Sequence, residues 1–94
     1  VPVYEGTKSL AEDGIIPAGA YRNREYAGDR VSFDSSVPLY MQDILFDPQT
    51  SGGLLLCIPE RNIKTVMKDL EKASVSSSVV GRATQRGSYT LNVK

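Results

Sequence analysis

The sequence feature that most constrains the fold is an uninterrupted apolar run, GLLLCI, at residues 53–58. Both alternating sets of side chains in this run are apolar, which is typical of a β-strand that is covered on both faces in the middle of a sheet. The preceding Asp47-Pro48 ends any helix before it, because a residue that precedes proline favours extended backbone. The run therefore predicts a sheet whose central strand needs cover on both sides.

Apolar residues recur at helical spacing in three other segments. They predict helices over approximately residues 2–13, 37–46 and 59–73, and Gly14 stands where a left-handed residue would end the first of them. The intervening GIIPAGAYRNREYAGDR, residues 14–30, has three glycines, a proline and no sustained period. It predicts a long ordered loop, and such loops are often functional.

Three short strands complete the predicted sheet. Residues 30–33 alternate in polarity, and residues 77–83 and 89–93 flank a turn at Gly87, which predicts a terminal hairpin. The predicted fold class is α+β (mixed α/β), a partial mixed sheet of about four strands with helices packed on it, and residues 1–94 are expected to form a single domain. The central strand lacks sufficient cover, and the chain starts at Val1 without linker-like composition, so we expect a fragment of a larger protein.

Composition excludes several classes of function. The 94 residues include 11 acidic and 11 basic side chains, so the chain has no net positive charge to attract nucleic acid or an acidic membrane surface. It has no histidine and a single cysteine, Cys57, which lies in the apolar run and is expected to be unreactive. No catalytic residue and no metal site is therefore predicted. No apolar run approaches the ~20 residues of a membrane helix, so we expect a cytoplasmic protein without a membrane partner.

The loop before the apolar run is suited to phosphate. Its two hydroxyls precede two glycines able to adopt positive φ, so consecutive backbone N–H groups can converge on an anion. In the alternative interpretation the glycines only allow a sharp turn into the strand. On the long loop, arginine and asparagine can hold phosphate or carboxylate groups, or form a solvated rim. The candidate site residues are Gln49, Thr50, Ser51, Gly52, Gly53, Asn23 and Arg22.

Two motifs carry a resemblance to a known family. The string DPQTSGGLL, Asp47–Leu55, resembles the C-terminal signature of selenophosphate synthetases, also called selenide, water dikinases. GIIPAGAYRN, Gly14–Asn23, resembles the family's G-x-x-P-G-G-T-x-x-N segment, with Ala18 in place of glycine and Ala20 in place of threonine. The family belongs to the ATP-using superfamily that includes aminoimidazole ribonucleotide synthetase.

The resemblance implies an enzymatic activity that this chain would support only together with an N-terminal domain that lies outside it. Family members convert ATP, selenide and water into selenophosphate, AMP and phosphate. Their N-terminal domain carries a catalytic cysteine or selenocysteine, a lysine, a glycine-rich loop and magnesium-binding aspartates, so Mg²⁺ and ATP would be bound mainly there and neither is expected in the fragment alone. The chain would be the latter part of the C-terminal domain and would shape the active-site cleft through its candidate residues. It would contact the N-terminal domain of the same longer protein, which is expected to form a homodimer. Alone, the chain is expected to be inactive.

Two alternatives stay open. One is another enzyme of the same superfamily, such as a hydrogenase-maturation or thiamine-phosphate kinase relative, in which the QTSGG string is not expected. The other is a non-catalytic interaction or dimerisation domain, for which an exposed apolar sheet face would be the partner surface.

Overall fold

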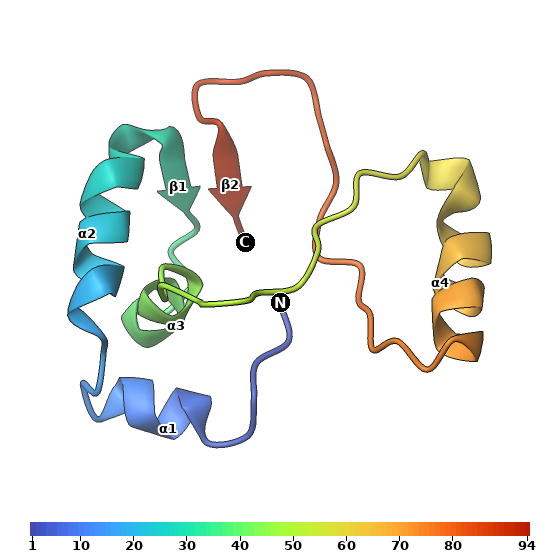
Figure 1. Cartoon of the computed structure of the whole chain (residues 1–94). Coiled ribbons are helices and arrows are strands. Elements are labelled where there is room, and N and C mark those ends of the chain that lie inside the picture. The colour runs from blue at the N-terminus through green and yellow to red at the C-terminus, as the bar shows by residue number, and fades with distance from the viewer. The chain divides into compact units, whose positions relative to one another are not determined.

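The computed structural model describes all 94 residues, which form two compact units. The larger unit comprises residues 3–51 and 85–94, and the smaller unit comprises residues 1–2 and 52–84. Each is described by itself. The elements of the larger unit, labelled in Figure 1 apart from the short 3-10 helix η1, are α1 (Thr7–Glu12), α2 (Ala18–Ala27), η1 (Gly28–Arg30), β1 (Val31–Phe33), α3 (Leu39–Leu45) and β2 (Leu91–Val93). Those of the smaller unit are η2 (Glu60–Asn62) and α4 (Ile63–Lys72).

The first helix ends as its sequence predicts. Gly14 has a φ of 77°, and its N–H donates to the Ala11 carbonyl at 3.1 Å while the N–H of Ile15 donates to Leu10 at 2.9 Å. These bonds satisfy carbonyl groups that the end of the helix would otherwise leave unpaired. The glycine is required because a side chain at positive φ is strained.

The prediction of a long loop over residues 14–30 is wrong, because most of this segment is helix α2. Apolar periodicity is weak here, since the segment is mostly polar and Ala20 is its one fully buried residue. Alanine, arginine and glutamate nevertheless favour a helix by intrinsic propensity. Contact with α3, described below, adds the packing that a helix this short needs.

The prediction of a terminal hairpin is also wrong. Residues 91–93 do form a strand, β2, but it pairs with β1 in parallel, with Val31 opposite Leu91 and Phe33 opposite Val93. Figure 1 shows the two arrows side by side and pointing the same way. Residues 77–83 form no strand. The prediction of residues 30–33 as a strand is confirmed, and β2 takes this distant partner in preference to the segment that precedes it in sequence.

The apolar run at 53–58 is not a strand in this structure. Leu54, Leu55 and Leu56 are 91%, 79% and 55% exposed, and no segment of the chain pairs with them. A strand forms only where a neighbouring strand takes its N–H and C=O groups. The sheet thus has two strands where about four were expected, while the α+β class is confirmed.

The two remaining predicted helices are present. α3 follows Pro38, whose fixed φ suits the start of a helix, and ends before Phe46. In the smaller unit α4 turns Ile63, Val66, Met67 and Leu70 to one partly covered face. No helix combines the length and the apolar composition needed to cross a bilayer.

The end of α4 offers a first test. Ser74 stands at the position that Gly14 fills after α1 and has a φ of 58°, and the N–H of Val75 donates to Leu70 at 2.9 Å. A non-glycine residue in this conformation costs about 1–2 kcal/mol. Ser74→Gly is therefore expected to raise the free energy of unfolding by about 1 kcal/mol, measured by urea denaturation. Ser78→Gly, at an exposed position without positive φ, is the control, and an equal gain in both variants would contradict the explanation.

Candidate functional site

The first motif segment and the start of the second, residues 47–51, meet within the larger unit. Gly19, near the start of α2, lies against Pro48, and a Cβ atom on Gly19 would come within 2.6 Å of the proline Cγ. Contacts this close between helix and loop require a residue without a side chain. The structure thus brings the GIIPAGAYRN and DPQTSGGLL strings together, although 28 positions separate these two residues in the sequence.

Asn23 anchors the base of the DPQTSGG loop. Its side-chain Nδ2 donates a hydrogen bond to the carbonyl oxygen of Phe46 at 2.8 Å. Phe46 caps the C-terminus of α3, where carbonyl groups lack partners within the helix. One proton of the Asn23 amide is therefore used to hold the loop base, and the second remains available to a ligand.

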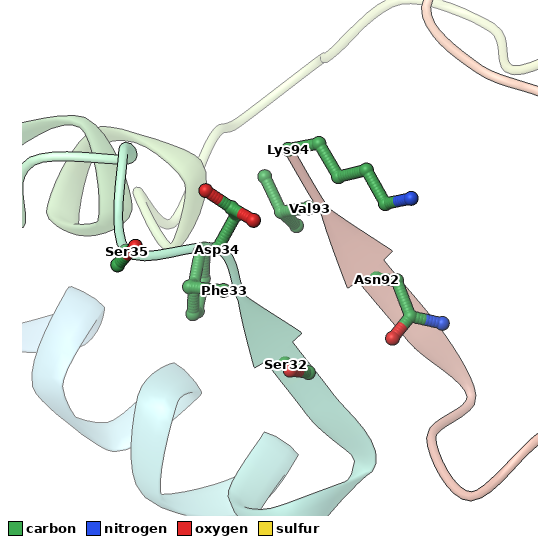
Figure 2. A pocket seen from close by; sticks show the side chains of 7 residues that line it. All are labelled: Ser32, Phe33, Asp34, Ser35, Asn92, Val93 and Lys94. Atoms are coloured by element: carbon green, nitrogen blue, oxygen red, sulfur yellow. The ribbon is translucent and has the colours of Figure 1, made fainter.

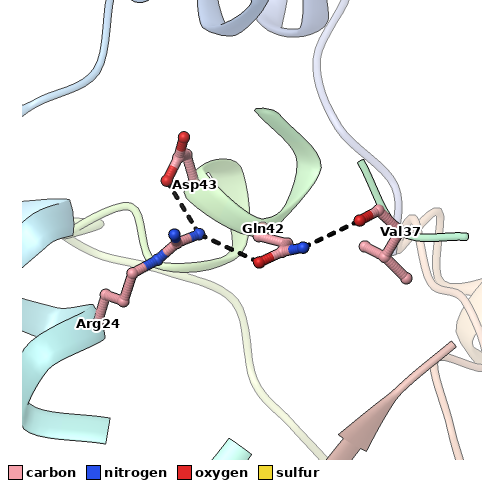
Figure 3. A network of polar contacts seen from close by, with 4 residues as sticks. All are labelled: Arg24, Val37, Gln42 and Asp43. Atoms are coloured by element: carbon pink, nitrogen blue, oxygen red, sulfur yellow. Dashed lines mark hydrogen bonds and ion pairs between the residues drawn. The ribbon is translucent and has the colours of Figure 1, made fainter. Parts of the chain in front are cut away.

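Arg24, next to Asn23, makes the densest set of contacts in this region (Figure 3). It forms an ion pair with Asp43 at 3.0 Å, a weaker hydrogen bond to Gln42 at 3.5 Å, and its guanidinium carbon lies 5.3 Å from the centre of the Phe46 ring. Gln42 in turn donates to the Val37 carbonyl at 2.9 Å. Arg24 is thus committed to α3 and is not a free phosphate ligand.

The Phe46 ring links this cluster to the sheet. It meets the ring of Phe33 on β1 edge to face, with centroids 5.8 Å apart and an angle of 69° between the planes. Edge-to-face pairs of this kind contribute beyond their buried area. The end of α3 is consequently held from α2 on one side and from β1 on the other.

The loop itself leaves its polar groups free. The N–H of Gln49 donates to Asp47 at 2.9 Å, but Thr50 and Ser51 donate no backbone hydrogen bond, and the side chains of Gln49, Thr50 and Ser51 are exposed and unpaired. The positive φ expected at the glycines belongs instead to Ser51, at 60°, and a side chain at Gly53 would meet open space. The loop presents donors to solvent.

Arg22 is the last of the predicted site residues. It is exposed on α2 and makes no ion pair. It follows Gly19 by three positions, and residues so spaced are neighbours on a helix surface. Its side chain is therefore attached beside the residue of α2 that contacts the loop, and no acidic side chain forms an ion pair with it.

A separate open pocket of about 280 Å³ lies at the carboxyl ends of β1 and β2. Figure 2 shows its lining, which includes Asp34 and Lys94. The backbone N–H and the hydroxyl of Ser36 donate to the Asp34 carboxylate at 3.0 and 2.7 Å. These two bonds lower the pKa of Asp34, desolvation opposes them in part, and the charge of Lys94 adds a smaller lowering effect. None of the predicted site residues lines this pocket.

Metal-binding side chains are not gathered in this chain. No group of three or more histidine, cysteine, aspartate or glutamate residues lies close enough to hold an ion. Several residues of the cluster were absent from the predicted site, namely Gly19, Arg24, Gln42, Asp43, Phe46 and Pro48. Gly19 and Pro48 lie within the two strings, and Arg24 is next to Asn23. The contacts of these residues join separate segments, so spacing along the chain did not indicate them.

Comparison with known proteins gives a consistent result. The chain is 36% identical over 94 residues to a selenide, water dikinase of Clostridium botulinum, covering 100% of this chain and 27% of the relative. It is 38% identical over 98 aligned residues to the protein of that name from Treponema denticola and 36% identical to that of Clostridioides difficile, with 99% of this chain and 27% of the relative covered in both.

No family model matches the chain. No solved structure matches it either. The chain spans only about a quarter of the length of the curated relatives it matches. The resemblance carried by the DPQTSGGLL string is confirmed: along essentially its whole length this chain is similar to selenide, water dikinases.

Proposed function

We propose that this chain is the C-terminal part of a selenide, water dikinase, an enzyme that makes selenophosphate, AMP and phosphate from ATP, selenide and water. The observation that carries the proposal is the similarity along the whole chain to relatives that are several times longer. The proposed protein has two domains, is a cytoplasmic homodimer, and contacts its N-terminal domain through the present chain.

The exposed apolar run supports the two-domain proposal. Leu54 and Leu55 are almost fully exposed, and contiguous exposed apolar surface marks a contact site. In the longer protein we expect residues 53–58 to pair with other strands, within a mixed sheet like that of aminoimidazole ribonucleotide synthetase. Backbone pairing and burial of the leucines on both faces would then stabilise the run.

In the proposed enzyme the DPQTSGG loop and Arg22 face the phosphate groups of the cleft. Phosphoryl transfer depends on positioning and on neutralising charge more than on covalent chemistry by the protein. The free N–H groups of Thr50 and Ser51 and the unpaired Arg22 are donors of the kind that bind phosphate oxygens. A loop fixed at its base and open at its tip suits that role.

This chain does not supply the magnesium site in the proposal. Its residues form no cluster that fits Mg²⁺, which requires near-octahedral oxygen ligands. As the resemblance to the family implies, we assign magnesium and ATP mainly to the N-terminal domain. Bound there, magnesium would neutralise charge on the phosphates, while the residues of this chain orient the phosphate groups.

Phosphorus NMR on the longer protein that contains this chain, with ATP, Mg²⁺ and selenide, tests the proposal. We expect selenophosphate to appear together with AMP. Release of ADP alone would contradict the proposal and favour another ATP-using member of the same superfamily. Stable ATP would also contradict it.

Thr50→Ala is expected to lower the turnover of the longer protein about tenfold. A hydrogen bond to a charged group contributes about 1.5–3 kcal/mol, and each 1.4 kcal/mol corresponds to a factor of about ten in rate. The rate of AMP formation measures the effect. Thr65→Ala, on the exposed face of α4, is the matched control. Equal turnover of the Thr50→Ala variant and the wild type would contradict a phosphate contact by the Thr50 hydroxyl.

A second candidate function is a non-catalytic interaction or dimerisation domain. The exposed leucines at 54–56 favour it, because such a surface is covered when a partner binds. Sedimentation equilibrium of the chain alone tests this candidate. A dimer of the chain whose dissociation constant is raised by Leu55→Asp, together with a longer protein that does not consume ATP, would favour it over the enzyme.

A further inference from the structure

We infer that Arg24 is a positioning residue for the DPQTSGG loop. It acts on the loop through the C-terminal half of α3 and touches no phosphate itself. The inference rests on the proposed function for its kinetic test, and a second measurement tests it without that function.

The contacts of Arg24 fall on residues 42–46, the second half of α3 and its cap, which precede the loop. The guanidinium binds the Asp43 carboxylate at 3.0 Å and lies 5.3 Å from the centre of the Phe46 ring, while Asn23 on the same helix holds the Phe46 carbonyl. Phe46 directly precedes Asp47-Pro48, and Gly19 packs on Pro48. Residues of α2 thus contact the C-terminal half of α3, its cap and the start of the loop.

Partial burial makes this ion pair more specific than a surface salt bridge. The side chains of Arg24 and Asp43 are 34% and 15% exposed, whereas the Lys72–Asp69 pair, at 3.4 Å, is more than 60% exposed on both sides. Exposed pairs contribute little. A planar guanidinium can hold a carboxylate and an aromatic face in one geometry, and lysine lacks that geometry.

The position of the loop has to be accurate for its donors to act. Displacing a group by about 1 Å can reduce a rate by as much as ~100-fold. The side chains of Gln49, Thr50 and Ser51 are exposed and unpaired, and the one backbone bond of the tip, from the Gln49 N–H to Asp47, stays within the loop. The position of the tip therefore depends on the base, which Arg24 holds together with Asn23.

The experiment compares Arg24→Met and Arg61→Met in the longer protein. Methionine keeps an unbranched apolar stem, and Arg61 is an exposed arginine without a hydrogen bond or an ion pair. We expect Arg24→Met to lower kcat about tenfold while KM for ATP changes less than twofold, and Arg61→Met to change neither. Arg24→Lys is expected to recover less than half of the loss.

A double variant separates positioning from general destabilisation. If Arg24 acts through the loop, its effect on kcat is expected to shrink to less than threefold in the Thr50→Ala background, since residues that act as a unit are not additive. Full additivity, or an unchanged kcat in Arg24→Met, would overturn the inference. A fall in kcat that only matches the unfolded fraction, measured by circular dichroism, would also overturn it.

Hydrogen exchange of the same proteins tests the inference when no selenophosphate forms. We expect exchange of the hydrogen-bonded amides of Phe46, Asp47 and Gln49 to become at least fivefold faster in Arg24→Met, with no change in Arg61→Met. Unchanged exchange there would overturn the role of Arg24 whatever the reaction. Faster exchange without selenophosphate in the wild type would retain the positioning role and reject the proposed function.

Discussion

Phe46→Ala is expected to lower the free energy of unfolding by about 2–3 kcal/mol. Truncating a fully buried phenylalanine to alanine costs about 3–5 kcal/mol, and Phe46 is only half-buried. The loss has three sources: the apolar area of the ring, its edge-to-face contact with Phe33, and its contact with the Arg24 guanidinium. Because these contacts join α2, the end of α3 and β1, the larger unit loses a contact shared by three of its elements.

Urea denaturation followed by far-UV circular dichroism measures this effect. Tyr4→Ala is the control, since Tyr4 is 90% exposed and surface substitutions stay within about 0.5 kcal/mol. Phe46→Leu keeps apolar volume but loses the ring, so about half of the stability is expected to return. A loss in Phe46→Ala no larger than that in Tyr4→Ala would refute the role of the ring.

Gly19→Ala is expected to destabilise the chain by about 1–3 kcal/mol, the usual cost of overpacking. The sign of this change in stability is informative, because alanine in place of glycine normally stabilises a helix by up to about 1 kcal/mol. Here the new methyl group would lie 2.6 Å from the Pro48 Cγ and 3.1 Å from its Cβ. The proline ring is rigid, so α2 and the loop have to separate.

A double-mutant cycle isolates the clash. Pro48→Ala removes the Cγ atom, so in that background the cost of Gly19→Ala is expected to fall by more than half. Gly87→Ala, where a Cβ would meet open space, is the matched control and is expected to be nearly neutral. If the cost of Gly19→Ala were the same with and without Pro48, the contact between the two motif segments would be refuted.

The helices were predictable from the sequence where an apolar stripe existed. α3 and α4 repeat apolar residues at helical spacing, and the end of α1 is marked by Gly14. α2 was missed because it has no such stripe and is stabilised by propensity and by contacts at Gly19, Asn23 and Arg24. β2 was placed correctly, but its partner was not, because turn rules describe only strands that follow each other in sequence.

The two sequence motifs indicated which segments form the candidate site, but they did not indicate the contacts that hold these segments together. The strings gave Asn23 and the loop from Gln49 to Ser51, and the structure places Asn23 at the base of that loop. Nothing in the strings indicates that Arg24 pairs with Asp43 or that Phe46 joins α3 to Phe33. These contacts depend on tertiary packing, which local spacing does not encode.

The parallel pair of β1 and β2 also determines the order in which the chain can fold. Val31 meets Leu91, so the pair forms only after a loop of roughly 60 residues has closed, and closure costs entropy before any contact compensates for it. On the ribosome β1 emerges well before its partner, whereas the contacts among α1, α2 and α3 are nearer in sequence. We expect these helices to assemble first. The interval between the synthesis of Leu54 and that of Leu91, when exposed leucines coincide with an unpaired strand, is then the period of greatest risk of aggregation.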